Sequence, residues 1–295
     1  MSCLPISCNL LTLNFLNYTM PLLTLTSDIG QHDFLAGAIK GQLLQVTSLF
    51  TIVDITHQLS PFNYPQAAYV CRNAIKNFPT GTCHLILVNL FDEKPEHMLL
   101  AEHKGHFIGC ADNGLLTMIL EELPQKVVAL PLDKNEQKNS IYCTTIFAKA
   151  FNEVLAGKPL EDIGNAAVSI QVKNPLRPLL GNNWMEGQII FIDNFENVIV
   201  NITREEFEEQ RKGRSFKIVF KRDEVIEKIC DSYADAQEGE KLALFNSAAY
   251  LEIAINKGNA AGLFGLQGYS EKQNQAQYQY LNNRLFYQTV KVYFD

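Results

Sequence analysis

The sequence predicts an α/β N-terminal domain with a mainly parallel sheet, followed by a smaller, mostly-β C-terminal domain of the barrel or sandwich type. From residue 21 to about 172, short runs rich in β-branched residues alternate with helix patterns, as is typical of parallel α/β folds. After Lys173, short strands separated by turn residues take over. We therefore place the first domain at 20–173, a linker at 174–184 and the second domain at 185–295.

The first strand of the N-terminal domain runs into acidic residues. An apolar run that begins at Leu22 ends at Ser27-Asp28, Gly30 permits a sharp turn, and Asp33 can cap the next helix. The carboxyl end of a parallel strand faces the crevice in which open α/β sheets bind ligands. Asp28 and Asp33 could therefore hold a ribose diol and a cationic group. The alternative is a turn residue and an N-cap.

The remaining elements follow from the same patterns. In the N-terminal domain we predict, in chain order, a strand at 51–56, a helix opened by Pro65, strands at 84–90 and 105–110, a helix after the turn at 112–114, and a helix at 141–156 that Gly157 ends. In the C-terminal domain we predict strands at 188–193, 198–202, 215–220, 241–245, 250–255 and 289–294. Residues 268–284, rich in Gln, Asn and Tyr, indicate a polar insertion before the last strand.

Composition excludes several classes of protein. The formal net charge is −7 and no basic patch is concentrated anywhere, which argues against a nucleic-acid partner. No apolar run reaches membrane-spanning length, so we expect no membrane partner. The seven cysteines lack CxxC spacing, so neither a disulfide framework nor a metal site is indicated, and we expect a cytoplasmic location.

Residues 1–19 carry no charged side chain and precede a second methionine, Met20. A secretory signal would begin with basic residues. We expect translation to start at Met20, with a weakly ordered extension as the alternative.

Six segments carry the functional signal, because no Gly-rich dinucleotide or triphosphate motif follows the first strand. In chain order they are Thr26-Ser27-Asp28-Ile29-Gly30 with Asp33, Ile52-Val53-Asp54-Ile55-Thr56-His57, Phe78-Pro79 with Gly81-Thr82, Asp112-Asn113-Gly114-Leu115-Leu116, Ile192-Asp193-Asn194-Phe195-Glu196-Asn197, and the segment from Leu251 to Ala261. Together they resemble the S-adenosyl-L-methionine (SAM) hydroxide adenosyltransferases, relatives of the SAM-dependent fluorinase and chlorinase. The resemblance covers roughly residues 20–266.

This resemblance implies a homotrimer in which SAM, as substrate and without a further cofactor, lies between the N-terminal domain of one subunit and the C-terminal domain of its neighbour. In the N-terminal domain, Asp28 would take the ribose hydroxyls, since a carboxylate accepts two hydrogen bonds at once. Phe62 falls where relatives carry an aromatic wall for the ligand, and Asp33 would approach the methionine amino group. Packing in the core is the alternative for Phe62.

The resemblance also implies ligand contacts in the C-terminal domain. Phe195 and Asn197 would meet the adenine, one by stacking and one through its amide. Asp193 would approach the methionine amino group and Ser247 the carboxylate. The alternatives are a core position for Phe195 and a β-turn for Asn197.

The chain departs from the family where an Asp, an Arg and a His position the attacking water. Asn89 stands at the Asp position, Glu96 or His97 at the Arg position, and Tyr142 at the His position. Asparagine cannot act as a base, although it can orient water, and a neutral tyrosine is a poor base at neutral pH. The polar residues 92–97 and 102–103 could rebuild the site, with His97 as the base and Glu93 beside it. The alternative is a solvated loop face.

The sequence therefore predicts an enzyme that binds SAM and cleaves its C5′–S bond, most simply with water, giving adenosine and L-methionine. The catalytic candidates are Asn89, His97 and Glu93. Two alternatives stay open: a catalytically inactive protein that binds SAM or adenosine, and an enzyme that uses another nucleophile. A halide is disfavoured, because Asp92 would repel an anion at the expected position.

Overall fold

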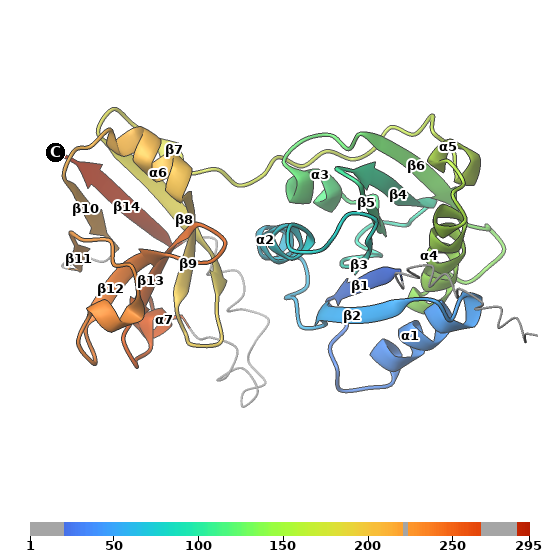
Figure 1. Ribbon diagram of the computed structural model, residues 1–295, viewed down its shortest axis with the longest axis horizontal. Helices are drawn as coiled ribbons and strands as arrows, with labels where there is room; N and C mark the ends of the chain where they lie inside the picture. The colour runs from blue at the N-terminus through green and yellow to red at the C-terminus, as the bar shows by residue number, and fades with distance from the viewer. Residues whose placement is uncertain (1–20, 221–223, 267–287) are drawn as a thin grey trace, which may run out of the picture.

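The computed structural model describes residues 21–220, 224–266 and 288–295, and it has the two predicted parts, an α/β N-terminal domain and a barrel-like β domain (Figure 1). The expected start at Met20 and the polar insertion at 268–284 lie outside the described residues. Within the described part of the chain, no helix is long and apolar enough to cross a membrane.

The N-terminal domain is built on a mixed sheet with the strand order β2-β1-β3-β5-β4-β6. The strands are β1 (Leu22–Ser27), β2 (Thr51–Thr56), β3 (Cys83–Leu87), β4 (His97–His103), β5 (His106–Ala111) and β6 (Lys126–Pro131). Strands β2, β1, β3 and β5 pair in parallel, whereas β4 is antiparallel to both β5 and β6. Asp28, Asn89 and Asp112 follow β1, β3 and β5, so they share the carboxyl edge of the sheet.

Strands β4 and β6 are absent from the sequence-based prediction. A solvated loop was one interpretation of the polar residues 92–97 and 102–103, but β4 begins at His97 and its apolar centre, Met98 to Ala101, is buried. Because charged and polar residues lie at both ends of this short strand, its sequence does not show the pattern of a strand.

Helices cover both faces of this sheet, as β-α alternation requires. Helices α1 (Leu35–Val46) and α4 (Ser140–Leu155), with the short α5 (Leu160–Ile163), pack on one face. Helices α2 (Tyr64–Ile75) and α3 (Leu115–Leu120) pack on the other. At Gly109 a Cβ would lie 2.7 Å from Phe147 Cδ1, so glycine there lets α4 approach the sheet. The result is a three-layer α/β/α domain.

The C-terminal domain has eight described strands in one antiparallel sheet, ordered β11-β10-β14-β8-β9-β13-β12 with β7 beside β8. They are β7 (Leu179–Leu180), β8 (Trp184–Ile192), β9 (Val198–Thr203), β10 (Phe216–Val219), β11 (Val225–Ile226), β12 (Lys241–Phe245), β13 (Tyr250–Ile255) and β14 (Thr289–Phe294). A bridge from Ile229 to Ala243 brings the two ends of the sheet together, so the sheet is nearly closed. Helices α6 (Arg204–Arg211) and α7 (Ala260–Leu263) and a 3-10 turn, η1 (Tyr233–Asp235), complete the domain.

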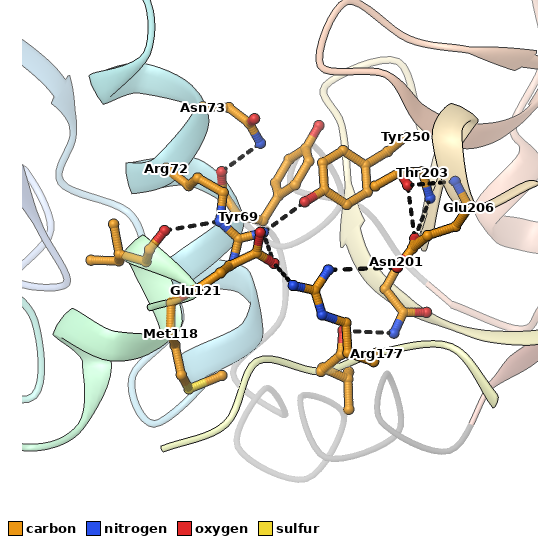
Figure 2. Close-up of polar contacts among 12 residues, drawn as sticks. Tyr69, Arg72, Asn73, Met118, Glu121, Arg177, Asn201, Thr203, Glu206 and Tyr250 are labelled. Carbon is orange, nitrogen blue, oxygen red and sulfur yellow. Dashed lines mark hydrogen bonds and ion pairs between the residues drawn. The ribbon is translucent and has the colours of Figure 1, made fainter. Parts of the chain in front are cut away.

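Five side chains form an interdomain clamp (Figure 2). Arg72 of α2 donates to Tyr250 Oη of β13 at 2.8 Å and lies 2.8 Å from Glu121 Oε1. Arg177 lies 3.1 Å from the same Glu121 oxygen and 3.5 Å from Glu206 Oε1 of α6. The clamp therefore connects both domains and the segment between them by charged contacts.

Candidate functional site

A cavity of about 270 Å³ opens at the carboxyl edge of the N-terminal sheet. It lies between the loop that follows β3 and the turn that follows β5, and Gln171 lines it as well. Three of its lining residues are the catalytic candidates Asn89, Glu93 and His97. The structure thus gathers in one cavity residues that the sequence places in a loop and at a strand end.

His97 and Asp112 form a pair in this cavity, with His97 Nε2 3.1 Å from Asp112 Oδ2. The pair follows from strand register, because Met98 is opposite Ala111 and the next residues outward are His97 and Asp112. The other Asp112 oxygen accepts the Gln171 backbone N–H at 2.7 Å. A carboxylate against one imidazole nitrogen fixes the ring orientation and leaves the other nitrogen available as a proton acceptor.

Asn89 links the cavity to its surroundings. The residue is buried and has a φ of 49°, a left-handed conformation that asparagine tolerates. Its backbone N–H donates to Asp28 Oδ2 at 2.8 Å, and its Oδ1 accepts the Phe62 N–H at 2.9 Å. Its buried Nδ2 has no hydrogen-bond partner among the described residues. A buried donor in that state suits a bound water or ligand.

Two acids that the sequence groups together have different environments. Asp28 is partly buried, and burial raises the pKa of its carboxyl above the ordinary 3.8, while the Asn89 N–H acts in the opposite direction. Asp33 is exposed, and its Oδ1 accepts the Leu35 N–H at 2.8 Å in the first turn of α1. Asp33 therefore accepts the first backbone N–H of α1, although the N-cap position itself is Phe34.

Glu93 is exposed at the rim, and its Oε2 accepts from Gln171 Nε2 at 3.2 Å. Tyr64, at the start of α2, donates to Asp92 Oδ2 at 2.7 Å. Sequence analysis assigns no role to Gln171 or Tyr64, and it names Asp112 only as part of a family motif. A strand-end position was a signal for Asp112, whereas nothing in the local sequence distinguishes Gln171.

The C-terminal candidates lie on two turns at one end of the β domain. Asp193 Oδ1 accepts the N–H groups of Phe195 and Asn197, each at 2.8 Å, and its Oδ2 accepts Asn197 Nδ2 at 3.1 Å. Ser247 is exposed in the turn between β12 and β13, where Asn246 Oδ1 accepts from Ala248 N at 3.0 Å. Asn197 thus has the turn position that was its alternative interpretation.

Phe62 and Phe195 are not core residues. Their exposed fractions are 65% and 75%, so the core alternative is wrong for both. Phe62 has a φ of 60°, and its backbone N–H donates to Asn89 Oδ1 just before α2 begins. Within the described residues, no hydrogen bond or ion pair joins the N-terminal candidates to the C-terminal candidates.

A larger cavity, about 430 Å³, lies at the opposite edge, between α2, α3 and the β4–β5 hairpin. His103, from the polar residues 102–103, lines it, but none of the other predicted site residues does. Among the described residues, no group of three or more His, Cys, Asp or Glu side chains could hold a metal ion.

The sequence matches the SAM hydroxide adenosyltransferase N-terminal domain at residues 23–164 and the C-terminal domain of the same family at residues 187–272. The (R)-S-adenosyl-L-methionine hydrolase of Methanocaldococcus jannaschii is 24% identical over 257 residues, covering 84% of this chain and 93% of that protein. The fluorinase of Nocardia brasiliensis is 26% identical over 288 residues, covering 85% and 95%. In fold, the chain is similar to an uncharacterized conserved protein from Thermotoga maritima, with a TM-score of 0.74, 22% identity, and 92% and 99% of the two chains covered. Because the two matched domains span most of its length, the chain belongs to the SAM hydroxide adenosyltransferase family.

Proposed function

We propose that this protein binds SAM and cleaves the C5′–S bond with water, giving adenosine and L-methionine. Membership of the family supports SAM as the ligand. The observation that carries the choice of water is the His97–Asp112 pair, which lies in the same cavity as Asn89. This pair supplies a base where the family's Asp, Arg and His are replaced.

In this reaction the protein has to orient the water and SAM and to accept one proton. The water oxygen forms a bond to C5′, and the C5′–S electron pair stays on sulfur, which leaves as the neutral thioether of methionine. The proton of the water passes to His97. A positioned base contributes about 10²–10⁴ in rate, and orientation of the reactants up to about 7–11 kcal/mol.

Each candidate has a role in this proposal. Asp28 binds the ribose hydroxyls, with the Asn89 N–H keeping its carboxylate in place. Asn89 Nδ2 donates to the attacking water. Glu93 supports the polar rim through Gln171.

We further propose a homotrimer in which SAM lies between the N-terminal domain of one subunit and the C-terminal domain of the next. The exposed rings of Phe62 and Phe195 support this arrangement, because each would gain a stacking partner. Asp33 and Asp193 would approach the methionine amino group, Asn197 the adenine and Ser247 the carboxylate. Buried, unpaired cysteines at 71, 83, 110, 143 and 230 support a cytoplasmic location.

A second candidate is a non-catalytic protein that binds SAM or adenosine. The observation in its favour is Tyr142, at the family's His position, whose hydroxyl accepts the Asp133 N–H at 2.8 Å and does not line the cavity. The residue that replaces the family's His thus makes a local structural contact.

The test is incubation of the purified protein with SAM in ¹⁸O-labelled water, followed by mass spectrometry of the products. We expect adenosine with ¹⁸O at the 5′ position, in wild type and in Glu161→Gln, which alters an exposed carboxylate on α5. We expect His97→Gln and Asp112→Asn to lose most of this activity. Intact SAM together with clear binding by calorimetry would favour the second candidate instead.

A further inference from the structure

Glu252 is a buried carboxylate of β13 that the proposed mechanism does not use. Its side chain is 2% exposed, and it lies on the face opposite the core residues Leu251 and Ile253. In the sheet it is opposite Ile199 of β9 on one side and Leu244 of β12 on the other. Side chains two residues apart share a face of a sheet. Asn197 lies two residues before Ile199 and Asn246 two residues after Leu244, so both lie in turns next to Glu252.

Glu252 contacts both turns that carry the C-terminal candidates. Tyr233 Oη donates to Glu252 Oε1 at 2.6 Å. The side-chain amides of Asn246 and Asn197 lie close enough to this carboxylate to lower its pKa. Asn246 in turn organises its own turn and donates to Tyr69 Oη of α2 at 3.2 Å. The two turns are therefore tied to one another through one carboxylate.

The charge around Glu252 is not balanced by a cation. No ion pair in the described ranges includes Glu252 or Asp193. Burial raises the pKa of Glu252 and the nearby Asp193 raises it further, whereas the Tyr233 hydrogen bond and the amides of Asn246 and Asn197 lower it. Burial raises the pKa of Tyr69 to about 12, and the same two carboxylates contribute to that rise. The groups that face Glu252 are thus tyrosines, amides and one further acid.

We propose that Glu252 is a positioning residue that fixes the two turns and releases a proton when a cationic ligand binds over them. The inference rests on the proposed function, in which the ammonium group of SAM lies near Asp193. A cation at that place stabilises the ionised form of a carboxylate, and by linkage the ionised carboxylate stabilises the bound cation. SAM affinity should then rise with pH until Glu252 is ionised in the free protein.

The experiment is calorimetric titration of the full chain with SAM across pH 4.5–8, in two buffers that differ in ionisation enthalpy. For wild type we expect proton release that falls to zero at high pH. For Glu252→Gln, which keeps the shape and an acceptor for Tyr233, we expect roughly tenfold weaker binding at neutral pH and less proton release. Glu238→Gln is the matched control, since Glu238 is exposed at the opposite end of the same β12–β13 hairpin.

Asp28 also titrates, so the readout is the difference between wild type and Glu252→Gln. Adenosine isolates the Asp28 contribution, because it has the ribose but neither cation, and its affinity should be equal in the two proteins. If Glu252→Gln does not fold, Tyr233→Phe replaces it: loss of the donor should shift the rise in SAM affinity to higher pH. Identical pH profiles for wild type and variant would overturn this inference alone. Absence of SAM binding in wild type would overturn the proposed function and this inference together.

Discussion

At the scale of single residues, Asn89 connects the candidate site. Its backbone holds the Asp28 carboxylate and its side-chain oxygen holds the loop at Phe62. A change at this position therefore affects the nucleoside contact and the aromatic ring together.

For Asp28→Ala we expect adenosine affinity to fall by about 2–3 kcal/mol, because a charge-assisted contact with two hydroxyls is lost. Calorimetry measures this, with Asp162→Ala as a control at an exposed carboxylate on α5. Unchanged affinity would remove Asp28 from the site.

For Asn89→Asp we expect faster SAM hydrolysis, since an acceptor for the proton of water returns to the family's Asp position. The left-handed backbone at this position suits aspartate as well as asparagine. Asn89→Ala separates this gain from a change in packing, and it should be slower than wild type. An unaltered rate for Asn89→Asp would show that the water is held elsewhere.

The sequence predicts some of these residues and not others. Asp28 follows an apolar strand, and that local pattern is enough to place it at the sheet edge. The pairing of His97 with Asp112 depends on the antiparallel register of β4 with β5, which no local pattern encodes. The exposure of Phe62 and Phe195 is likewise a property of the folded surface, because an aromatic residue is equally compatible with the core.

At the scale of elements, three strands share a buried polar chain. Thr24 Oγ1 of β1 lies 2.7 Å from His84 Nδ1 of β3, and His84 Nε2 lies 3.0 Å from His106 Nδ1 of β5. Burial lowers the pKa of His84 to about 3 and also lowers that of His106. Both imidazoles are therefore neutral in the folded protein at neutral pH.

These two buried histidines predict that the folded protein loses stability in acid. The unfolded chain binds protons at these histidines below about pH 6.5 and the folded protein does not, so their contribution to stability is full above that pH. Between pH 6.5 and about 4, His84 should lower the free energy of unfolding by up to about 1.4 kcal/mol per pH unit, and His106 acts in the same direction. Urea denaturation measures the slope, which should be smaller in His84→Gln and unchanged in the exposed His32→Gln. Equal slopes in all three proteins would contradict the assignment.

Elements are predictable where their patterns are long. Helix α4 has a sixteen-residue amphipathic pattern ended by Gly157, and its prediction was close. Strand β4 has only a short apolar centre between polar ends, and it was missed.

At the scale of the whole molecule, the change from β-α alternation to consecutive strands was enough to predict both fold classes. The arrangement of the domains was not predictable, because the interdomain clamp joins residues as far apart as Arg72 and Tyr250.

For Arg72→Ala we expect a loss of roughly 3 kcal/mol in stability, because Glu121 and Tyr250 lose a largely buried partner. We also expect thermal unfolding to broaden or split as the domains uncouple. Scanning calorimetry measures both, with Lys158→Ala, at an exposed ion pair, as the control. A single sharp transition at the wild-type temperature would show that the clamp does not couple the domains.

The turn at Lys104-Gly105, with φ values of 48° and 77°, sets the register between β4 and β5. Side chains alternate between the faces of a strand, so removal of one residue from this turn would point His97 away from Asp112. The turn lies a strand's length from the cavity, about 20 Å for seven residues. A one-residue deletion there would therefore disable the site as thoroughly as replacement of His97, although every residue of the cavity would be intact.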